Sequence, residues 1–234
     1  MNKSKKTVLI TGGVKRIGKA IAEKFYNAGY QLKIHYNTSD QEAFSLADKF
    51  DAKIFCIDFA NYTNYQFKEM LADTTVLINN ASVYLTDKNP SYIQSKENDK
   101  MQMLVNYEVP VKLMELFNEL NSVENMSIIN ILDAAVLQAN SVYNSYTQSK
   151  FALFEATLTY AKKLAPKIRV NGVAPGTILP PSWISNGSME KSMQQMLLNI
   201  PPTVEDIAKT CLFLSETYGI TGEVITVDSG QNMQ

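Results

Sequence analysis

The stretch TVLITGGVKRIG, residues 7–18, decides the fold because a short β-rich run meets a glycine turn that opens a helical pattern. Apolar residues then recur at spacings of three and four as far as Ala28, and Gly29 stands where a helix C-cap glycine is expected. Glycines let the backbone approach a ligand closely, and a helix N-terminus offers free N–H groups to a pyrophosphate. The stretch therefore predicts a dinucleotide site. A Walker-type phosphate site is disfavoured because no Gly-Lys-Ser/Thr follows.

The rest of the chain repeats this alternation of strand and helix, which is typical of a parallel sheet with crossover helices. The expected strands are Thr7–Thr11, Leu32–Tyr36, Lys53–Asp58, Thr75–Asn79, Ser127–Leu132, Arg169–Ala174 and Val224–Val227. Capping-box spacing at Ser39 with Glu42, and at Thr203 with Asp206, predicts two helix starts. We expect an α/β fold, a Rossmann-type, doubly wound, seven-stranded parallel sheet with helices on both faces. With 234 residues, 45% of them hydrophobic, one domain is expected over residues 1–234.

Three further segments bear on the site and on assembly. Ser82–Gln102 and Thr177–Asn199 lack a regular pattern and are expected to be loops at the rim of an active site, the second being the candidate substrate loop. The helical segment Phe151–Ala165 is apolar on more than one face, which a surface helix would not be. It predicts a subunit interface.

Composition excludes several classes of protein. With 22 basic and 23 acidic residues the net charge is −1, so the positive field that binds nucleic acid is missing. No run of about 18 apolar residues is present and the apolar segment after the first basic residues is short, so we expect no membrane span and a cytoplasmic protein. Two cysteines and one histidine, His35, supply neither a disulfide scaffold nor a usual zinc ligand set, and no metal is expected.

The end of the second strand indicates which dinucleotide binds. Sites for NAD usually place an acidic residue there to hold the ribose 2′-hydroxyl. Here the strand runs into Tyr36, Asn37, Thr38 and Ser39, and no carboxylate stands at its tip, although Asp40 is close by. Lys15 in the glycine turn, together with the Thr38 and Ser39 hydroxyls, would suit a 2′-phosphate. We therefore expect NADP (NADPH) rather than NAD.

A tyrosine one helical turn before a lysine is a candidate proton donor, because the ammonium favours the phenolate and lowers the tyrosine pKa. Three such pairs occur: Tyr84 with Lys88, Tyr92 with Lys96, and Tyr146 with Lys150. Only Tyr146 follows a strong apolar strand and begins a helix. That position lies near the carboxyl ends of the strands, where open α/β sheets bind ligands. Tyr146 and Lys150 are the predicted catalytic pair, whereas the other two pairs fall in the loop-like stretch.

In their order along the chain, these and further motifs resemble the short-chain dehydrogenase/reductase family over nearly the whole sequence. The markers are Thr11-Gly12 with Gly18, Asp58, Asn79-Asn80-Ala81-Ser82, Asn106, Tyr146 with Lys150, Pro175-Gly176, and Thr221-Gly222. The resemblance implies that Asp58 meets the adenine, that Asn106 holds a water in a proton relay, and that Lys150 also binds the nicotinamide ribose. The expected cofactor contacts are Gly12, Lys15, Arg16, Ile17, Tyr36, Asn37, Thr38, Ser39, Asp58, Phe59, Asn80, Ala81, Ser82, Tyr146, Lys150, Pro175, Gly176 and Ile178.

Two departures from the commonest family pattern resemble its pteridine reductase branch. Arg16 stands where most members have a second glycine in the turn, and Asp133, thirteen residues before Tyr146, stands where most have serine. Ser82 after Asn80-Ala81 fits the same branch. The resemblance implies that Asp133 works with Tyr146 and Lys150 on a pterin, that Arg16 reaches the pyrophosphate and the substrate, and that Tyr84 stacks on the pterin ring. Expected substrate contacts are Arg16, Ser82, Tyr84, Asp133 and Tyr146.

The aspartate also has a chemical rationale. Reducing a carbonyl builds negative charge on oxygen, which a neighbouring carboxylate opposes, whereas reducing the C=N bond of a pterin requires a proton that a carboxyl group can relay. We therefore expect NADPH-dependent reduction of a dihydropterin, such as dihydromonapterin or dihydrobiopterin, with Tyr146 as proton donor. A reductase of small carbonyl or 3-oxoacyl substrates is the alternative. A catalytically silent cofactor-binding regulator is a third, disfavoured because Asn106, Tyr146 and Lys150 all remain. The family resemblance implies a homotetramer.

Overall fold

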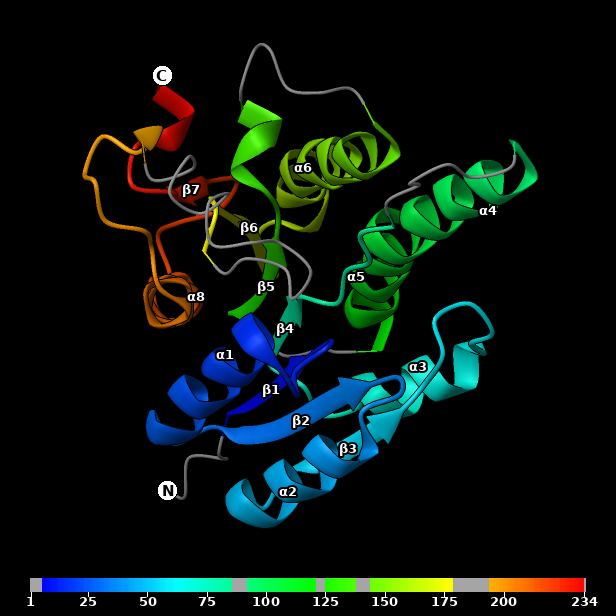
Figure 1. Cartoon of the computed structure of the whole chain (residues 1–234). Helices are drawn as coiled ribbons and strands as arrows, with labels where there is room; N and C mark the ends of the chain where they lie inside the picture. Colours follow the sequence, from blue (N-terminus) through cyan, green and yellow to red (C-terminus); the bar gives the residue numbers. More distant parts are fainter. Residues whose placement is uncertain (1–5, 86–91, 121–124, 138–143, 179–193, 234) are drawn as a thin grey trace.

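Seven parallel strands form one twisted sheet in the order β3-β2-β1-β4-β5-β6-β7 (Figure 1). The computed structural model describes residues 6–85, 92–120, 125–137, 144–178 and 194–233. The strands are β1 (Thr7–Ile10), β2 (Gln31–Tyr36), β3 (Lys53–Cys56), β4 (Val76–Asn79), β5 (Met126–Ile131), β6 (Ile168–Pro175) and β7 (Val224–Val227). Every predicted strand is present, and the predicted α/β fold is confirmed. The bounds differ most at β3, which ends at Cys56 rather than at Asp58.

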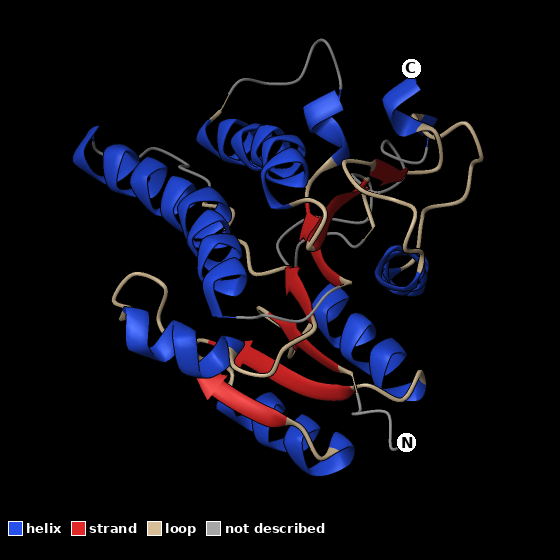
Figure 2. Ribbon diagram, turned by 180° about the vertical axis from the view of Figure 1, so that it is seen from behind, coloured by secondary structure: helices blue, strands red, loops and turns tan. Residues whose placement is uncertain are grey.

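Helices cover both faces of the sheet, as the two opposite views show (Figures 1 and 2). On one face lie α1 (Arg16–Asn27), α2 (Asp40–Phe50) and α8 (Val204–Glu216), which bury Phe25, Ile34 and Ile207 in one core. On the other face lie α3 (Asn64–Leu71), α5 (Val109–Leu120) and α6 (Ser145–Leu164), which bury Phe67, Phe117 and Ile128 in a second core. This arrangement is the doubly wound architecture that the alternation of strands and helices predicts.

The helix ends confirm two of the predicted signals and correct one. Thr203 Oγ1 accepts from the Asp206 backbone N–H at 3.2 Å, and the Asp206 carboxylate accepts from the Thr203 N–H at 3.0 Å, which completes a capping box. Gly29, at φ +87°, follows the last turn of α1 as expected. Helix α2 does begin after Ser39, but the Ser39 side chain makes no capping hydrogen bond. The predicted Glu42 partner is engaged by Lys15 instead.

Part of the predicted loop Ser82–Gln102 is helical, which corrects the sequence analysis. Helix α4 (Tyr92–Met103) runs through one π-helical turn, η1 (Leu104–Glu108), into α5, and it packs beside α6. The helix carries several charged residues and no apolar stripe in its first turns, so hydrophobic periodicity could not reveal it. Tyr92 and Lys96 therefore belong to a helix. Most of the predicted substrate loop 177–199 lies outside the described residues.

The strand order positions the site. Crossovers run outward in both directions from the neighbouring strands β1 and β4, and open sheets bind ligands at such a switch point, outside the carboxyl ends of the strands. The glycine turn after β1 and the segments after β4, β5 and β6 all lie at that edge. None of the helices in the described part of the chain is both long and apolar enough to cross a bilayer.

Candidate active site

The glycine turn after β1 packs against the segment that follows β4. Thr11 Oγ1 accepts hydrogen bonds from the backbone N–H groups of Asn80 and Ala81, at 2.9 and 3.0 Å. The Asn80 amide donates to the carbonyl oxygen of Gly12 at 3.0 Å. A β-carbon added at Gly18 would overlap that carbonyl oxygen, so the turn requires glycine there. A turn held this closely, at the N-terminus of α1, fits the pyrophosphate of a dinucleotide.

His35, in β2, holds the same turn by a hydrogen bond, a role that could not be identified from the sequence. The Gly12 N–H donates to His35 Nδ1 at 3.2 Å, which makes Nε2 the protonated nitrogen that donates to the Ile57 carbonyl at 2.9 Å. The ring stacks on Phe59 with a centroid separation of 4.1 Å. Burial lowers the pKa of His35 to about 4, so the ring is neutral near pH 7. The only available signal was a lone histidine in a buried strand.

Two predicted cofactor contacts near His35 have other partners. Phe59 is 5% exposed and its ring stacks on the imidazole, so the predicted contact with the cofactor, which stays a prediction, would have to come from its backbone. Asp58 is exposed, and its carboxylate accepts from the Ala60 N–H at 2.9 Å and from Asn61 Nδ2 at 2.8 Å. These bonds lower the pKa of Asp58. A fixed, ionised carboxylate at this edge remains compatible with an adenine amino group.

The tip of β2 has the residues that a 2′-phosphate needs. Lys15 Nζ lies 2.8 Å from Glu42 Oε1 in the first turn of α2, and both side chains are about half exposed. Exposed ion pairs contribute little to the free energy of folding, so a phosphate can replace the Glu42 carboxylate beside the Lys15 ammonium at little cost. Asn37 and Thr38 are exposed at the strand tip, whereas Tyr36 is buried and offers only its backbone. These residues fit a 2′-phosphorylated cofactor better than one with a free 2′-hydroxyl.

Arg16 begins α1 in an unusual conformation. Its φ is +49°, the left-handed region that favours glycine. A glycine at this position would avoid the strain, which agrees with the glycine that the family pattern has there. A non-glycine residue kept in such a conformation points to a function for its side chain.

Asp133, Tyr146 and Lys150 converge where β5 meets the start of α6. The Tyr146 hydroxyl donates to Asp133 Oδ2 at 3.1 Å. Asp133 Oδ1 accepts from the Ala135 N–H at 2.9 Å, so the same carboxylate also caps the short helix η2 (Ala134–Leu137). Lys150 is 3% exposed, and its Nζ donates to the Ile131 carbonyl at 2.9 Å. The predicted set is therefore brought together, and the two local duties of Asp133 fix the direction of its carboxylate.

The electrostatics of this cluster correct one sequence-based expectation. Lys150 was expected to lower the tyrosine pKa, but burial and then the Asp133 carboxylate raise the pKa of Tyr146 well above 10. Burial lowers the pKa of Lys150 to about 8, against an opposing influence of Asp133. Lys150 Nζ lies 5.9 Å from the Tyr146 ring centroid, and its bond is to Ile131, not to the phenol oxygen. Tyr146 thus keeps its proton near pH 7.

Asn106 lies in the π-helical turn η1 and organises the segment after β4. Its Oδ1 accepts from Ser82 Oγ at 3.0 Å and from the Val83 N–H at 2.8 Å. Its Nδ2 donates to the Val83 carbonyl at 2.9 Å and to Ser149 Oγ at 3.0 Å. Both lone pairs and both amide hydrogens are therefore used. The side chain therefore connects the Ser82 segment to α6, and the relay water that the family resemblance implies at Asn106 stays a prediction.

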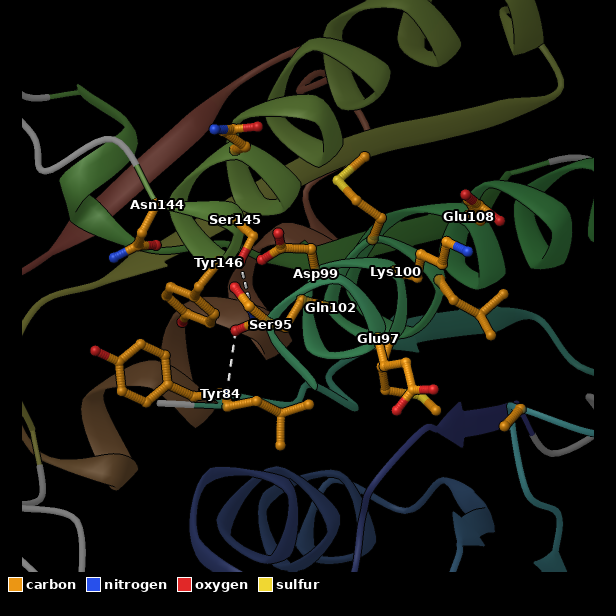
Figure 3. A pocket seen from close by; sticks show the side chains of 16 residues that line it. Tyr84, Ser95, Glu97, Asp99, Lys100, Gln102, Glu108, Asn144, Ser145 and Tyr146 are labelled. Carbon is orange, nitrogen blue, oxygen red and sulfur yellow. Dashed lines mark hydrogen bonds between the residues drawn. The ribbon is translucent and has the colours of Figure 1, made fainter. Parts of the chain in front are cut away.

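Tyr84 and Tyr146 lie side by side in the wall of an open pocket (Figure 3). The two rings meet edge to face, with centroids 4.8 Å apart, and Tyr84 is 47% exposed. The pocket extends from these rings along α4 and the first turn of α6, and Gln102, Ser145 and Gln148 also line it. An exposed aromatic face beside the half-buried Tyr146 suits a flat, polar heterocycle.

The remaining predicted contacts lie at the end of β6 and the start of α1. A β-carbon at Gly176 would lie 2.6 Å from the Asp228 β-carbon, so glycine is needed for this close approach. Pro175 ends β6, while Ile178 is 9% exposed and, with Ile17, packs into the core that contains α1.

Comparison with known proteins follows the same lines. A family model described as enoyl-(acyl carrier protein) reductase matches residues 13–232. Dihydromonapterin reductase of Klebsiella pneumoniae subsp. pneumoniae is 27% identical over 237 residues, covering 97% of each chain. Dihydromonapterin reductase of Escherichia coli O6:K15:H31 is 26% identical over 235 residues, again covering 97% of each. The crystal structure of FolM alternative dihydrofolate reductase 1 from Brucella suis in complex with NADP superimposes with a TM-score of 0.90 at 31% identity, covering 98% of this chain and 96% of that one.

Proposed function

The chain belongs to the short-chain dehydrogenase/reductase family, and we propose that it reduces a dihydropterin to the tetrahydropterin with NADPH. The observation that carries the proposal is the Asp133 carboxylate on the hydroxyl of Tyr146, 3.1 Å away, with the Tyr84 ring beside it. The names of the relatives support the same substrate class, because dihydromonapterin and dihydrofolate share the dihydropterin ring. We infer that a ring of this kind lies against Tyr84.

Tyr146 donates the proton to the ring nitrogen of the substrate. Its raised pKa keeps it protonated until the substrate nitrogen accepts charge, and the buried Lys150 lessens the cost of the phenolate that forms. NADPH, when bound, supplies the hydride. Asp133 connects Tyr146 to solvent-derived protons, because a phenolate and a carboxylate at hydrogen-bond distance cannot both stay charged at low cost. The carboxyl group therefore returns a proton to Tyr146 after each turnover.

The proposed cofactor is NADPH because the tip of β2 offers a cation and hydroxyls rather than a carboxylate. Lys15, Thr38 and Ser39 would hold the 2′-phosphate, and the glycine turn would hold the pyrophosphate. Charge-assisted hydrogen bonds contribute roughly 1.5–3 kcal/mol, so NADPH should bind at least about tenfold more tightly than NADH. Equal dissociation constants in titration calorimetry would contradict this assignment.

The experiment that tests the reaction is NADPH oxidation by the purified protein with dihydromonapterin, dihydrobiopterin and dihydrofolate beside a panel of ketones and 3-oxoacyl thioesters. Asp133→Ser is run in parallel. Losing one component of general acid catalysis should lower dihydropterin turnover on the order of 10²-fold, while any ketone turnover should survive or rise because no carboxylate opposes the oxyanion. NADPH affinity should change little. A variant with full dihydropterin turnover would show that Asp133 only caps η2.

We also infer the homotetramer that the family resemblance implies. Phe151 on α6 is 46% exposed, and its ring lies 6.0 Å from that of Phe154 on the same helix. Phe154 is half-buried, so Phe151 is the ring left exposed on a helix that already packs on the sheet, and an exposed apolar side chain there favours association through α6. Light scattering should give a mass several times that of the 26.2 kDa chain at micromolar concentration, and a monomer would contradict the inference.

A further inference from the structure

Gln102 of α4 connects the two chain segments that carry the tyrosines of the site. The side chain is buried, with 1% exposed. Its Oε1 accepts a hydrogen bond from the Leu85 backbone N–H at 3.1 Å, and its Nε2 donates to Ser145 Oγ. Figure 3 shows both bonds, with Gln102 between the end of the Tyr84 segment and the first residue of α6. One amide therefore spans the pocket wall from the substrate side to the catalytic helix.

The chemistry of the partners fixes the orientation of this amide. A backbone N–H can only donate, so the Gln102 oxygen must face Leu85. The NH₂ group then faces Ser145, whose hydroxyl oxygen can accept. Because the side chain is buried, no water can replace either bond without rearrangement of the helix. The link is thus directional and specific to a carboxamide of this length.

The two bonded residues are the sequence neighbours of the facing tyrosines. Leu85 follows Tyr84 and Ser145 precedes Tyr146, and the two rings meet with centroids 4.8 Å apart. Asn106, one helical turn after Gln102, holds both backbone groups of Val83 on the other side of Tyr84. Two carboxamides from successive turns therefore fix the backbone on either side of Tyr84, and both also reach α6, Asn106 at Ser149 and Gln102 at Ser145, the residue next to Tyr146.

We propose that Gln102 is a positioning residue that sets the gap between Tyr84 and Tyr146, and so determines how a flat heterocycle is held against the proton donor. The inference rests on the proposed function for its substrate, but the gap itself is a property of the protein. Gln102 touches neither reacting atoms nor cofactor in this role. It acts through Leu85 on the binding ring and through Ser145 on the donor.

The test is Gln102→Met, which keeps the side-chain volume and removes both hydrogen bonds. Misplacement by about 1 Å costs up to about 10²-fold, so kcat/KM for dihydropterin should fall between about 10- and 100-fold, with KM raised and kcat lowered. The NADPH dissociation constant should stay within about twofold. Ser145→Ala removes only the link to α6, so it should lower kcat and leave KM nearly unchanged.

Gln66→Met is the matched control, because Gln66 also accepts from a backbone N–H, that of Thr63 at 2.9 Å, but in α3, which does not line the pocket. It should leave both kinetic constants unchanged. A Gln102→Met protein that melts earlier but keeps KM and kcat would overturn the proposal, since the residue would then be structural only.

A crystal structure of Gln102→Met gives a readout that does not depend on the substrate. We expect the Tyr84 and Tyr146 rings to lose the 4.8 Å edge-to-face contact. Unchanged ring geometry would overturn the proposal even if dihydropterins are substrates. If the wild-type protein reduces no dihydropterin, the proposed function fails, while a displaced ring pair would still support the role of Gln102.

Discussion

The cofactor side and the substrate side of this site are built in different ways. Around the glycine turn, Gly18 lies so close to the Gly12 carbonyl oxygen that an added β-carbon would not fit. Around Tyr146 the geometry depends on individual side-chain hydrogen bonds, to Asp133 and between Gln102 and the neighbouring segments. The first region is defined by shape and the second by chemistry. Substitutions around the glycine turn should therefore act through steric overlap, whereas substitutions around Tyr146 should act through lost hydrogen bonds and changed charge.

The largest effect is expected at Tyr146, the proposed proton donor. Tyr146→Phe keeps the ring against Tyr84 but removes the hydroxyl that Asp133 holds. Dihydropterin turnover should fall by about 10²- to 10⁴-fold, the range for a general acid, in steady-state NADPH oxidation.

The cofactor side should respond far less than turnover, because Tyr146 is only one of the many expected NADPH contacts. The NADPH dissociation constant of Tyr146→Phe, measured by fluorescence titration, should remain near that of the wild type. A parallel loss of NADPH affinity would show that the two regions are not separable in the way the geometry indicates.

A substitution in the glycine turn tests whether the cofactor side depends on close packing. In Gly18→Ala the added carbon would overlap the Gly12 carbonyl oxygen and lie 2.7 Å from Asn80 Nδ2, so the turn must shift. Overpacking costs typically 1–3 kcal/mol, and if most of it falls on the turn, NADPH should bind about 10- to 100-fold more weakly. Gly219→Ala is the control, because a β-carbon there meets nothing within 4 Å. Equal affinities in the two variants would contradict the shape argument.

Lys150 allows a test by pH because its folded-state pKa of about 8 lies below the ordinary 10.5. Between these values the unfolded state binds more protons than the folded state, so the free energy of unfolding should rise with pH. The cost of the buried charge is present below pH 8 and is relieved as pH rises. From pH 8 to about 9.5, below the range where an unfolded tyrosine ionises, Lys150 alone should contribute a gain of roughly 1.5 kcal/mol in denaturant titrations of the cofactor-free protein. The Cys211 thiol offsets part of this gain, because burial raises its pKa and only the unfolded thiol ionises in this range, so the contribution of Lys150 is read as a difference between variants.

Lys150→Met removes this titrating group and provides the control for the pH experiment. The variant should lack the rise in unfolding free energy between pH 8 and about 9.5. An equal rise in both proteins would mean that another group is responsible and that Lys150 keeps an ordinary pKa.

The smallest effect is expected at the mouth of the cofactor site. Glu42→Gln frees Lys15 from its ion pair and removes a negative charge near the proposed 2′-phosphate. Because the pair is exposed, NADPH should bind more tightly by no more than about fivefold, and the gain should shrink with added salt. NADH affinity is the internal control and should not change. Weaker NADPH binding would mean that Glu42 orients Lys15 rather than competing for it.

Much of the shape-defined region could be predicted from the sequence. The run Thr7–Ile10 is entirely buried, and two glycines follow after Thr11. The hydrophobic pattern and the turn residues therefore predict the same structure, a strand followed by a tight turn. The capping box at Thr203 was readable for the same reason, because its function depends on two residues at a fixed spacing. Choosing Tyr146 among three tyrosine–lysine pairs required only its place after a strand.

The chemistry-defined region was less predictable because it depends on contacts between distant segments. The hydrogen bonds made by the side-chain amides of Gln102 and Asn106 cannot be predicted from hydrophobic periodicity. The sequence of α4 lacks an apolar stripe, so the segment was predicted to be a loop. The pKa of Tyr146 was predicted in the wrong direction, because the spacing to Lys150 says nothing about burial or about where the Lys150 hydrogen bond goes. Asp133 was predicted from the family resemblance, and the structure adds that its carboxylate accepts a hydrogen bond from Tyr146 and raises the pKa of that tyrosine.

Following the transferred hydride tests most directly whether this protein reduces a dihydropterin with NADPH. The purified protein is mixed with dihydromonapterin and NADPH that carries deuterium at the transferable position, and the products are analysed by mass spectrometry beside a parallel reaction with a ketone. The proposed reaction predicts one deuterium on a ring carbon of the tetrahydropterin, formed in step with NADP⁺. Deuterium found only in the alcohol from the ketone, with the pterin unreduced, would contradict it.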